Sequence, residues 1–522
     1  MKKIIILVSV LFLSVAFMAY YYFSKLGTEN EAKDLALQSA TNNAAIVFAF
    51  QNDKSFYQII SGQNLIQQVL GEDKTVLLKQ LKESFINDNV LNNYIQDQQI
   101  YISVLPDSNK TLNFLLTVQI QPDKNINQFY EQIKGKKQIR KIEDNLYTTN
   151  LNDSSTVFIG IQNQVVTLST SLKLIKDAGI RLTENPFTAY IKESNRLTKS
   201  ILLHAYINFN QSPLLLKNIV AGNLNGEITF LNKQNSFATL NYNFSKEKIL
   251  FNGSTELKSA DNYLKLFEDL QPQSTSIQNI LPDNTANYAL YVYDDYRNWI
   301  KKLASWQEQK NETNKISAVV KNIKNEYRTD LNTIFPVYTK NQFILFQLST
   351  TEKLGAILLN NGEKVKQLLL DVSADYNEDI KLFKSSDILY AYFGEPFKKF
   401  GRPYYTIIDN NLIVANNAST IQSFLNNYKN NRLLIQTPQY LDAMNQLSAK
   451  SNVSYYINIK NSFSIFRSTI QSSFYKHLSA DSGLKSFDTF YYQMSTDKNK
   501  FITNLLLNKY LKPEIPDSLS NR

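Results

Sequence analysis

An unbroken apolar run, Ile4 to Phe23, opens the hydrophobic pattern of the chain, and it contains neither charge nor proline. Its twenty residues are what an α-helix needs to cross a bilayer core of about 30 Å. Lys2 and Lys3 precede the run, which favours a cytoplasmic N-terminus. We expect residues 1–25 to be a retained membrane anchor and residues 26–42 to be a juxtamembrane linker. A cleaved signal peptide is the alternative for the same run.

After the anchor, the pattern changes to short alternating strands and amphipathic helices. Alternation of apolar and polar residues predicts strands over residues 44–50, 99–105 and 112–120, and helical spacing predicts a helix around residues 126–133. Polar segments that are too short for parallel crossovers join several strands, which favours antiparallel pairing. The predicted fold class is α+β, with mainly antiparallel sheet and helices packed on one face.

The order of these elements occurs twice. The segment Leu203–Phe209, which reads LHAYINF, resembles Val453–Ile459, which reads VSYYINI, so Tyr206 corresponds to Tyr456. Further matches lie on both sides of this pair in the same order, as an internal repeat requires. We therefore expect repeat one over residues 43–257, a helix and linker over residues 258–280, repeat two over residues 281–508, and a flexible tail over residues 509–522.

The start of repeat two carries a resemblance to known proteins. It reads Leu281-Pro282-Asp283-Asn284-Thr285 and is followed by an alternating strand. This start resembles that of modules in uncharacterised bacterial membrane-anchored envelope proteins, which also tend to carry an N-terminal membrane segment. Repeat one lacks the Leu-Pro pair. The resemblance implies a tandem α+β ectodomain and no particular activity.

Composition narrows the compartment and the partners. Hydrophobic residues make up 43% of the 522 residues and charged residues 20%, which is typical of globular domains. The chain has no cysteine, which excludes disulfides and thiolate metal sites and suits a bacterial envelope. The net charge of +10 favours anionic lipid or glycan surfaces. We expect a single-pass protein of the bacterial cytoplasmic membrane with its bulk periplasmic or extracellular, and no nucleic-acid partner.

Candidate catalytic groups are sparse. The chain has only two histidines, His204 in a predicted strand, where we expect it to pack in the core, and His477, which we expect in solvent. Two scattered histidines do not make a zinc site of the usual type. Asp294 and Asp295 form a carboxylate pair of the kind that glycosidases use, but their position favours a helix cap. We expect no cofactor, no bound metal and no enzymatic activity.

A basic stretch is the first candidate interaction site. It contains Lys134, Lys136, Lys137, Arg140 and Lys141, whereas the corresponding residues 375–379 of repeat two are acidic. One interpretation is a helix C-terminus that Gly135 caps and the lysines stabilise through the helix dipole. The other interpretation is contact with an anionic surface.

A glycine- and proline-containing loop over residues 393–405 is the second candidate interaction site. Its candidate residues are Phe393, Phe397, Lys398, Lys399, Phe400, Arg402 and Tyr404. Repeat two is about four residues longer here than repeat one, so the shared fold does not require the loop. We expect some of the phenylalanines to be partly exposed for contact with a protein or a lipid headgroup. A hairpin that folds its rings back onto the sheet is the alternative.

Three functions follow from this sequence. The first is a membrane-anchored binding or scaffolding ectodomain, whose partners are the membrane through Ile4 to Phe23 and another envelope protein or lipid. The second is a carrier or receptor for an apolar ligand such as lipid, held between sheet and helices. The third is an enzyme that processes envelope glycans.

Overall fold

A computed structural model describes residues 34–509, apart from residues 62, 107–111, 137, 152–154, 180–184, 196–200, 223–235, 244, 246–247 and 481–482. The predicted anchor, Ile4 to Phe23, and the predicted tail from residue 510 onward lie outside the described residues. Within the described ranges, no helix has both the length and the apolar character needed to cross a membrane.

The first module covers the described residues from 34 to 257. Its elements are α2 (Leu35–Thr41), β1 (Ile46–Gln51), α3 (Lys54–Ser61), α4 (Asn64–Leu70), α5 (Glu72–Leu81), η1 (Lys82–Ile86), α6 (Asn89–Ile95), β2 (Gln99–Pro106), β3 (Leu112–Gln119), α7 (Ile126–Lys134), β4 (Ile139–Glu143), β5 (Leu146–Asn150), β6 (Thr156–Gln162), β7 (Val165–Ser169), α8 (Leu172–Ala178), α9 (Pro186–Asn195), β8 (His204–Asn208), α10 (Ser212–Ile219), β9 (Ser236–Asn243) and β10 (Lys248–Leu257).

The second module covers the described residues from 258 to 509. Its elements are η3 (Tyr263–Phe267), β11 (Gln273–Ser274), η4 (Ile277–Ile280), β12 (Thr285–Val292), α11 (Tyr296–Gln309), α12 (Thr313–Tyr327), α13 (Leu331–Tyr338), β13 (Thr339–Leu348), β14 (Lys353–Leu359), α14 (Gly362–Leu368), β15 (Ser373–Asp375), β16 (Lys381–Phe383), α15 (Ile388–Phe393), η5 (Glu395–Phe397), β17 (Tyr404–Ile408), β18 (Asn411–Ala415), α16 (Ala418–Lys429), η6 (Leu434–Gln436), α17 (Pro438–Met444), β19 (Lys450–Ser451), β20 (Val453–Asn458), α18 (Phe463–Thr469), α19 (Ser472–Ser479), η7 (Leu484–Ser486), β21 (Thr489–Asp497) and β22 (Lys500–Asn508).

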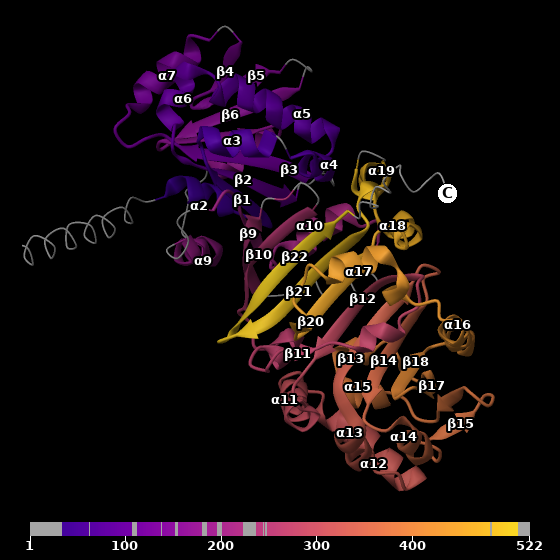
Figure 1. The fold of residues 1–522 in the computed structure, drawn as a ribbon. Coiled ribbons are helices and arrows are strands. Elements are labelled where there is room, and N and C mark those ends of the chain that lie inside the picture. The colour runs from indigo at the N-terminus through magenta and orange to yellow at the C-terminus, as the bar shows by residue number, and fades with distance from the viewer. Residues whose placement is uncertain are drawn as a thin grey trace, which may run out of the picture.

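The predicted α+β class with antiparallel sheet is confirmed, but both modules contribute to one continuous sheet of 20 strands. Its spatial order is β4-β5-β6-β7-β3-β2-β1-β8-β9-β10 in the first module, continued by β22-β21-β20-β12-β13-β14-β18-β17-β16-β15 in the second. The second order repeats the first in reverse, strand for strand. Figure 1 shows β10, β22 and β21 running between the two halves.

The two halves meet at a local twofold axis. When Tyr206 is matched with Tyr456, their sheet partners Thr239 and Tyr491 match as well, and continuing this register across β10 and β22 matches Asn252 with Asn504. These two asparagines lie directly opposite each other in the β10–β22 pair, and Asn252 Nδ2 donates to Asn504 Oδ1. A surface that contacts its own equivalent is the hallmark of a twofold interface. The chain therefore resembles a dimer folded from one polypeptide.

Helices cover both faces of the sheet, which corrects the expectation of one covered face. In β12, the residues Tyr288, Leu290 and Val292 pack in a core beneath α16 and α17, whereas Ala289 and Tyr291 pack in a core beneath α11 and α13. Successive strand residues point to opposite faces. The first module has the same arrangement, with α2, α8 and α9 on one face and α3 to α7 on the other. Strands buried on both faces show little alternation, which hid the second helix layer.

Two segments that we expected to be linkers belong to the modules. Residues 34–42 include α2, whose residues from Ala36 to Thr41 are buried. Between the modules, the expected helix is present as η3, with Leu264 and Phe267 buried in the core of the second module. The expected linker after it contains β11, which pairs with β19, and is followed by the buried Ile277. The polar composition of residues 271–276 indicated a linker, but a short strand also tolerates such residues when its backbone finds a partner.

Contacts of α4 with α19 and η7 tie the modules together. The Nε2 atom of His477 lies 3.0 Å from the carbonyl oxygen of Val69, and Ser486 Oγ donates to Gln68 Oε1 at 2.9 Å. Gly71 has φ +82° and its Cα faces the His477 ring so closely that a Cβ would lie 2.6 Å from Cε1. The expectation that His477 is only solvated was therefore wrong, because the tertiary contact crosses between modules.

Candidate functional site

A cleft of about 410 Å³ lies between α2 and α8 in the first module. This volume is within the range of roughly 300–1,000 Å³ that is typical of small-molecule sites. Strands β5, β6 and β7 form its floor, and the turns between β4 and β5 and between β6 and β7 form its rim. It is lined by Leu35, Ser39, Glu143, Asp144, Asn145, Leu146, Gly160, Ile161, Gln162, Asn163, Val165, Thr167, Ile175, Lys176, Ala178 and Gly179.

Polar contacts at its first turn fix the position of α2. Asp34 caps the helix, since its carboxylate accepts from the backbone N–H of Leu37 at 2.8 Å. The hydroxyl of Tyr101 donates to the same carboxylate at 2.7 Å, and Leu35 N–H donates to Gln119 Oε1 at 3.2 Å. Burial, together with the Asp34 charge, raises the pKa of Tyr101 well above its ordinary value, so this hydroxyl remains a donor. The wall of the cleft is therefore anchored to β2 and β3.

A glycine in the floor lets α8 approach the sheet. A Cβ at Gly160 would lie 2.6 Å from Thr167 Oγ1 and 2.8 Å from Ile175 Cγ2. Ile175 lies directly above this position, so the middle of α8 rests on β6 and β7. The cleft is the space between α8 and α2. Leu146, Val165 and Ile175 give the interior an apolar lining.

Ser39 is a buried polar group without a hydrogen-bond partner. Its side chain is 1% exposed, and its Oγ makes no hydrogen bond within the part of the chain that the structure describes. It lines both the main cleft and a neighbouring cleft of about 170 Å³, which Leu105, Leu115 and Lys173 also line. An unsatisfied buried hydroxyl costs about 1–3 kcal/mol, so a ligand that supplies an acceptor there gains that energy.

An ion pair spans the mouth of the cleft. Lys176 on α8 reaches Glu143 on β4 with an Nζ–Oε1 distance of 2.8 Å, and both side chains are about half exposed. The neighbouring Asp144 is held by Lys141 at 2.6 Å, and this hydrogen bond and charge lower the pKa of Asp144. The entrance thus presents one acid and one base from two different elements, with a second carboxylate beside them that already has a partner.

The corresponding place in the second module is filled. There α16 lies over β17 and β18 as α8 lies over β6 and β7, but it has 12 residues where α8 has 7. Ile421, Phe424 and Leu425 of α16 are fully or almost fully buried in the core beneath it. The shared strand arrangement therefore does not require an open cleft. In the second module, the short η4 contacts β13 and β14 as α2 contacts β2 and β3 in the first module.

The loop over residues 393–405 does not expose its phenylalanine rings. Phe393, Phe397 and Phe400 are each 0% exposed and belong to the core of the second module, so the expectation of partly exposed phenylalanines was wrong. Space for them exists because β14 carries Gly355, where a Cβ would lie 2.8 Å from Phe397 Cε1. Comparison with the corresponding stretch of repeat one could not reveal this space.

The cations of the same loop contact its own module. Lys398 Nζ lies 3.5 Å from Glu312 Oε1 and 5.1 Å from the centre of the Tyr390 ring, while Arg402 Nε donates to the carbonyl oxygen of Phe383 at 2.9 Å. Lys399 lies over the ring of Phe400, and the partly buried Tyr404 packs edge-on against Tyr376. The folded-back hairpin describes this loop better than a contact surface does.

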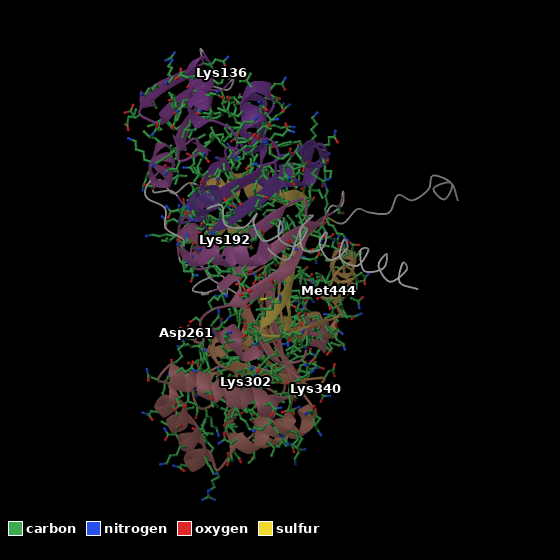
Figure 2. The ribbon with its side chains drawn as sticks, turned by 90° about the vertical axis from the view of Figure 1, so that its left-hand side faces the viewer. Lys136, Lys192, Asp261, Lys302, Lys340 and Met444 are labelled. Carbon is green, nitrogen blue, oxygen red and sulfur yellow. The ribbon has the colours of Figure 1, made fainter. Side chains whose placement is uncertain are left out.

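The basic stretch lies at the outer end of the first module, where Figure 2 labels Lys136. The helix α7 ends at Lys134 with Gly135 as its cap, as the structural interpretation predicted. Most of the described cations have carboxylate partners: Lys134 pairs with Glu131, Lys136 with Asp88 and Lys141 with Asp144. Arg140 is exposed on the edge strand β4, and Lys137 lies outside the described residues.

The remaining candidate catalytic groups have structural surroundings. His204 is buried in β8 and its Nδ1 lies 2.9 Å from Asn241 Oδ1, as a packed core histidine should be. Asp295 caps α11 by accepting from Asn298 N–H at 3.1 Å, as expected. Among the described residues, no group of three or more acidic or histidine side chains could hold a metal ion.

Sequence reasoning did not find the cleft. Ser39 lay in a segment that we expected to be a linker, and Glu143 and Lys176 were not candidates. The available signal was the helical spacing of Leu35 and Ser39, one turn apart, directly after a capping Asp34. The ion pair offered no signal, because its two residues come together only when α8 packs on β6 and β7 of the sheet that β4 ends.

Comparison with known proteins assigns the chain to no family. No protein family and no curated protein matches it. Among solved structures, crystal form IV of TP0453 aligns with 46% of this chain and 87% of that chain, with 13% sequence identity and a TM-score of 0.22. We base no inference on a likeness of this extent, and the resemblance to bacterial envelope proteins stays a prediction.

Proposed function

We propose that this protein is a membrane-anchored binding protein of a bacterial envelope that holds a small amphipathic ligand in the α2–α8 cleft. The observation that carries this proposal is the difference between two modules with the same strand pairing. The first module keeps a cleft of about 410 Å³ at the place where the second module packs Phe424 and its neighbours. Because the fold is stable without an opening at this place, the opening indicates a role in binding.

The lining supports an amphipathic ligand. Leu146, Val165 and Ile175 make the interior apolar, whereas the Glu143–Lys176 pair makes the mouth charged. Pockets of this kind bury the apolar part of a ligand and orient it through a few polar groups. We propose binding rather than catalysis, because none of the described cleft-lining residues is a histidine that could activate the Ser39 hydroxyl.

The place of the cleft in the chain suits a ligand drawn from the membrane. Residues 24–34 separate the proposed anchor from Leu35, and eleven residues span at most roughly 40 Å. The cleft would therefore stay near the bilayer surface, where amphipathic molecules are concentrated. This also accounts for a helix that follows the anchor so directly and forms one wall of the cleft.

Photocrosslinking of the full chain in vesicles tests the proposal. A neutral fatty alcohol with a diazirine at its chain end should label peptides that contain α2 or α8. Ala178 lines both clefts, so Ala178→Phe should fill the space and remove most of this labelling. Ala304→Phe, on the exposed side of α11, is the matched control and should leave the labelling intact. Labelling that is absent from both helices, or unchanged in Ala178→Phe, would contradict the proposal.

An exposed edge strand favours contact with a protein partner as a second candidate function. Strand β4 ends the sheet order, and its Ile142 is 43% exposed beside Arg140. Edge strands are templates for an added strand, and charged residues usually guard them. Pull-down from envelope extract should lose a specific partner in Ile142→Glu and retain it in Val76→Glu, an exposed position on α5. Equal recovery with both variants would exclude β4 as the contact.

A further inference from the structure

We infer that the ligand of the α2–α8 cleft has a zwitterionic head, with an ammonium group that pairs with Glu143 and an acidic group that pairs with Lys176. This inference rests on the proposed function and adds the chemical class of the ligand. It follows from the three polar features of the cleft, which are the ion pair at the mouth, the charge balance around it and the hydroxyl of Ser39.

The ion pair at the mouth can open at little cost. Glu143 and Lys176 are 2.8 Å apart, but their side chains are 58% and 50% exposed. Exposed ion pairs contribute about 0–1 kcal/mol, so the two charges separate readily when better partners arrive. A head that carries both an ammonium and an acidic group replaces each partner with an equivalent one. Two charge-assisted hydrogen bonds then take the place of one ion pair.

The charge balance around the cleft disfavours heads of a single sign. An anionic head would pair with Lys176 and leave Glu143 beside it without a partner, and a cationic head would do the reverse. The next carboxylate, Asp144, already has Lys141 at 2.6 Å. At the second cleft, Lys173 and Asp177 again bring one charge of each sign. A balanced head is therefore the one that satisfies every charge at the entrance.

Ser39 adds a third element to the ligand. Its buried hydroxyl lies behind the mouth, where the two clefts share it, and it has no partner among the described residues. When the Ser39 side chain turns toward the cleft, a carbonyl oxygen of the ligand would accept from this hydroxyl and remove its desolvation cost. The combination of zwitterionic head, carbonyl and apolar body describes two sources, a phosphoethanolamine lipid with its ester, and a short apolar peptide with its free ends.

The absence of native cysteine provides a clean reporter for the test. The single substitution Gln162→Cys places a thiol at the rim, where an environment-sensitive dye can report ligand entry into the full chain held in lipid nanodiscs. The probes are dihexanoyl phosphatidylethanolamine, dihexanoyl phosphatidylglycerol, the dipeptide Leu-Leu and decanol. We expect binding of the ethanolamine lipid or the dipeptide to be at least several-fold tighter than binding of the anionic glycerol lipid.

Charge variants separate the head from the rest of the ligand. Glu143→Gln and Lys176→Gln should each weaken the zwitterionic probe roughly tenfold, because each removes one charged hydrogen bond. The double exchange Glu143→Lys with Lys176→Glu keeps one charge of each sign and should restore most of the affinity. Glu131→Gln is the matched control, since it breaks a similar exposed pair on α7 and should change nothing.

The outcomes distinguish a failure of the zwitterionic head from a failure of the proposed function. Whichever of the ethanolamine lipid and the dipeptide binds identifies the source, and either supports the inference. Equal binding of the ethanolamine and glycerol lipids, or no effect of the charge variants, would overturn the zwitterionic head while decanol binding still supports an apolar cleft. If decanol also fails to change the fluorescence, the proposed function falls together with the inference.

Discussion

Replacing Phe397 by alanine should strongly destabilise the second module. The Phe397 side chain is 0% exposed, and its ring centre lies 5.3 Å from that of Phe393, 5.6 Å from that of Phe343 and 5.9 Å from that of Phe400. Truncation leaves a cavity, because Gly355 beneath the ring has no side chain that could move into the space. Such Phe→Ala changes cost about 3–5 kcal/mol, and complete burial places this one at about 4 kcal/mol.

Tryptophan fluorescence in urea measures this loss in the right module. Both tryptophans of the chain, Trp299 and Trp306, lie on α11, and the Trp299 ring centre is 6.4 Å from that of Phe393. With a denaturant slope of about 3 kcal/mol per molar urea, a loss of about 4 kcal/mol lowers the midpoint by roughly 1.3 M. Leu370→Ala, at a position 51% exposed, is the control and should change stability by no more than about 0.5 kcal/mol.

A small loss of stability would contradict the burial of Phe397. If Phe397→Ala lowers the free energy of unfolding by less than about 1 kcal/mol, the ring is not a core side chain in solution. The loop over residues 393–405 would then regain its place as a candidate contact surface. A loss near the expected size instead removes the three phenylalanines from consideration as partner contacts.

Three further predictions concern other parts of the fold. Gly253→Ala should lower the free energy of unfolding in urea by about 3 kcal/mol or more, because its Cβ would lie 1.8 Å from the Thr239 carbonyl oxygen. An unchanged free energy of unfolding would contradict the β9–β10 packing. A double-mutant cycle of Asn252→Ala and Asn504→Ala should show about 1 kcal/mol of coupling, and none if the twofold contact is absent. Burial lowers the pKa of His204 below 6.5 despite its Asn241 hydrogen bond, so the unfolded chain binds the proton more tightly and stability falls as pH drops through 6.5. His204→Gln should reduce the fall in melting temperature between pH 7.5 and 5. An unchanged fall would show that other groups cause it.

The sequence was informative wherever a pattern depends on one strand or one turn. The Tyr-Ile-Asn strands, β8 and β20, occupy matching positions in the sheet, and Gly135 and Asp295 cap the helices that they were expected to cap. These features arise from local periodicity and local hydrogen bonding, which a single sequence displays directly.

Features that depend on packing between distant residues were not predictable. The alternation expected in Thr285–Val292 is weak because helices cover both of its faces, so the second helix layer was missed. Phe397 was judged from the composition of the other repeat, yet Gly355 decides its burial. The cleft arises where the short helix α8 lies beside α2. A capping residue signalled the start of α2, but no motif marks the short length of α8 or the space between the two helices.

The joint between β10 and β22 has a consequence for biosynthesis. Strand β10 is complete once Leu257 has been made, but its partner β22 lies at Lys500–Asn508. At roughly 5–20 residues per second, the ribosome needs on the order of 10–50 s to reach it. During this interval the first module presents a long unpaired edge, which is a template for pairing with another nascent chain. Because that edge pairs with its own structural equivalent in the finished protein, two unfinished chains could join through their β10 strands. A holding chaperone that covers β10 until β22 emerges would prevent this misassembly.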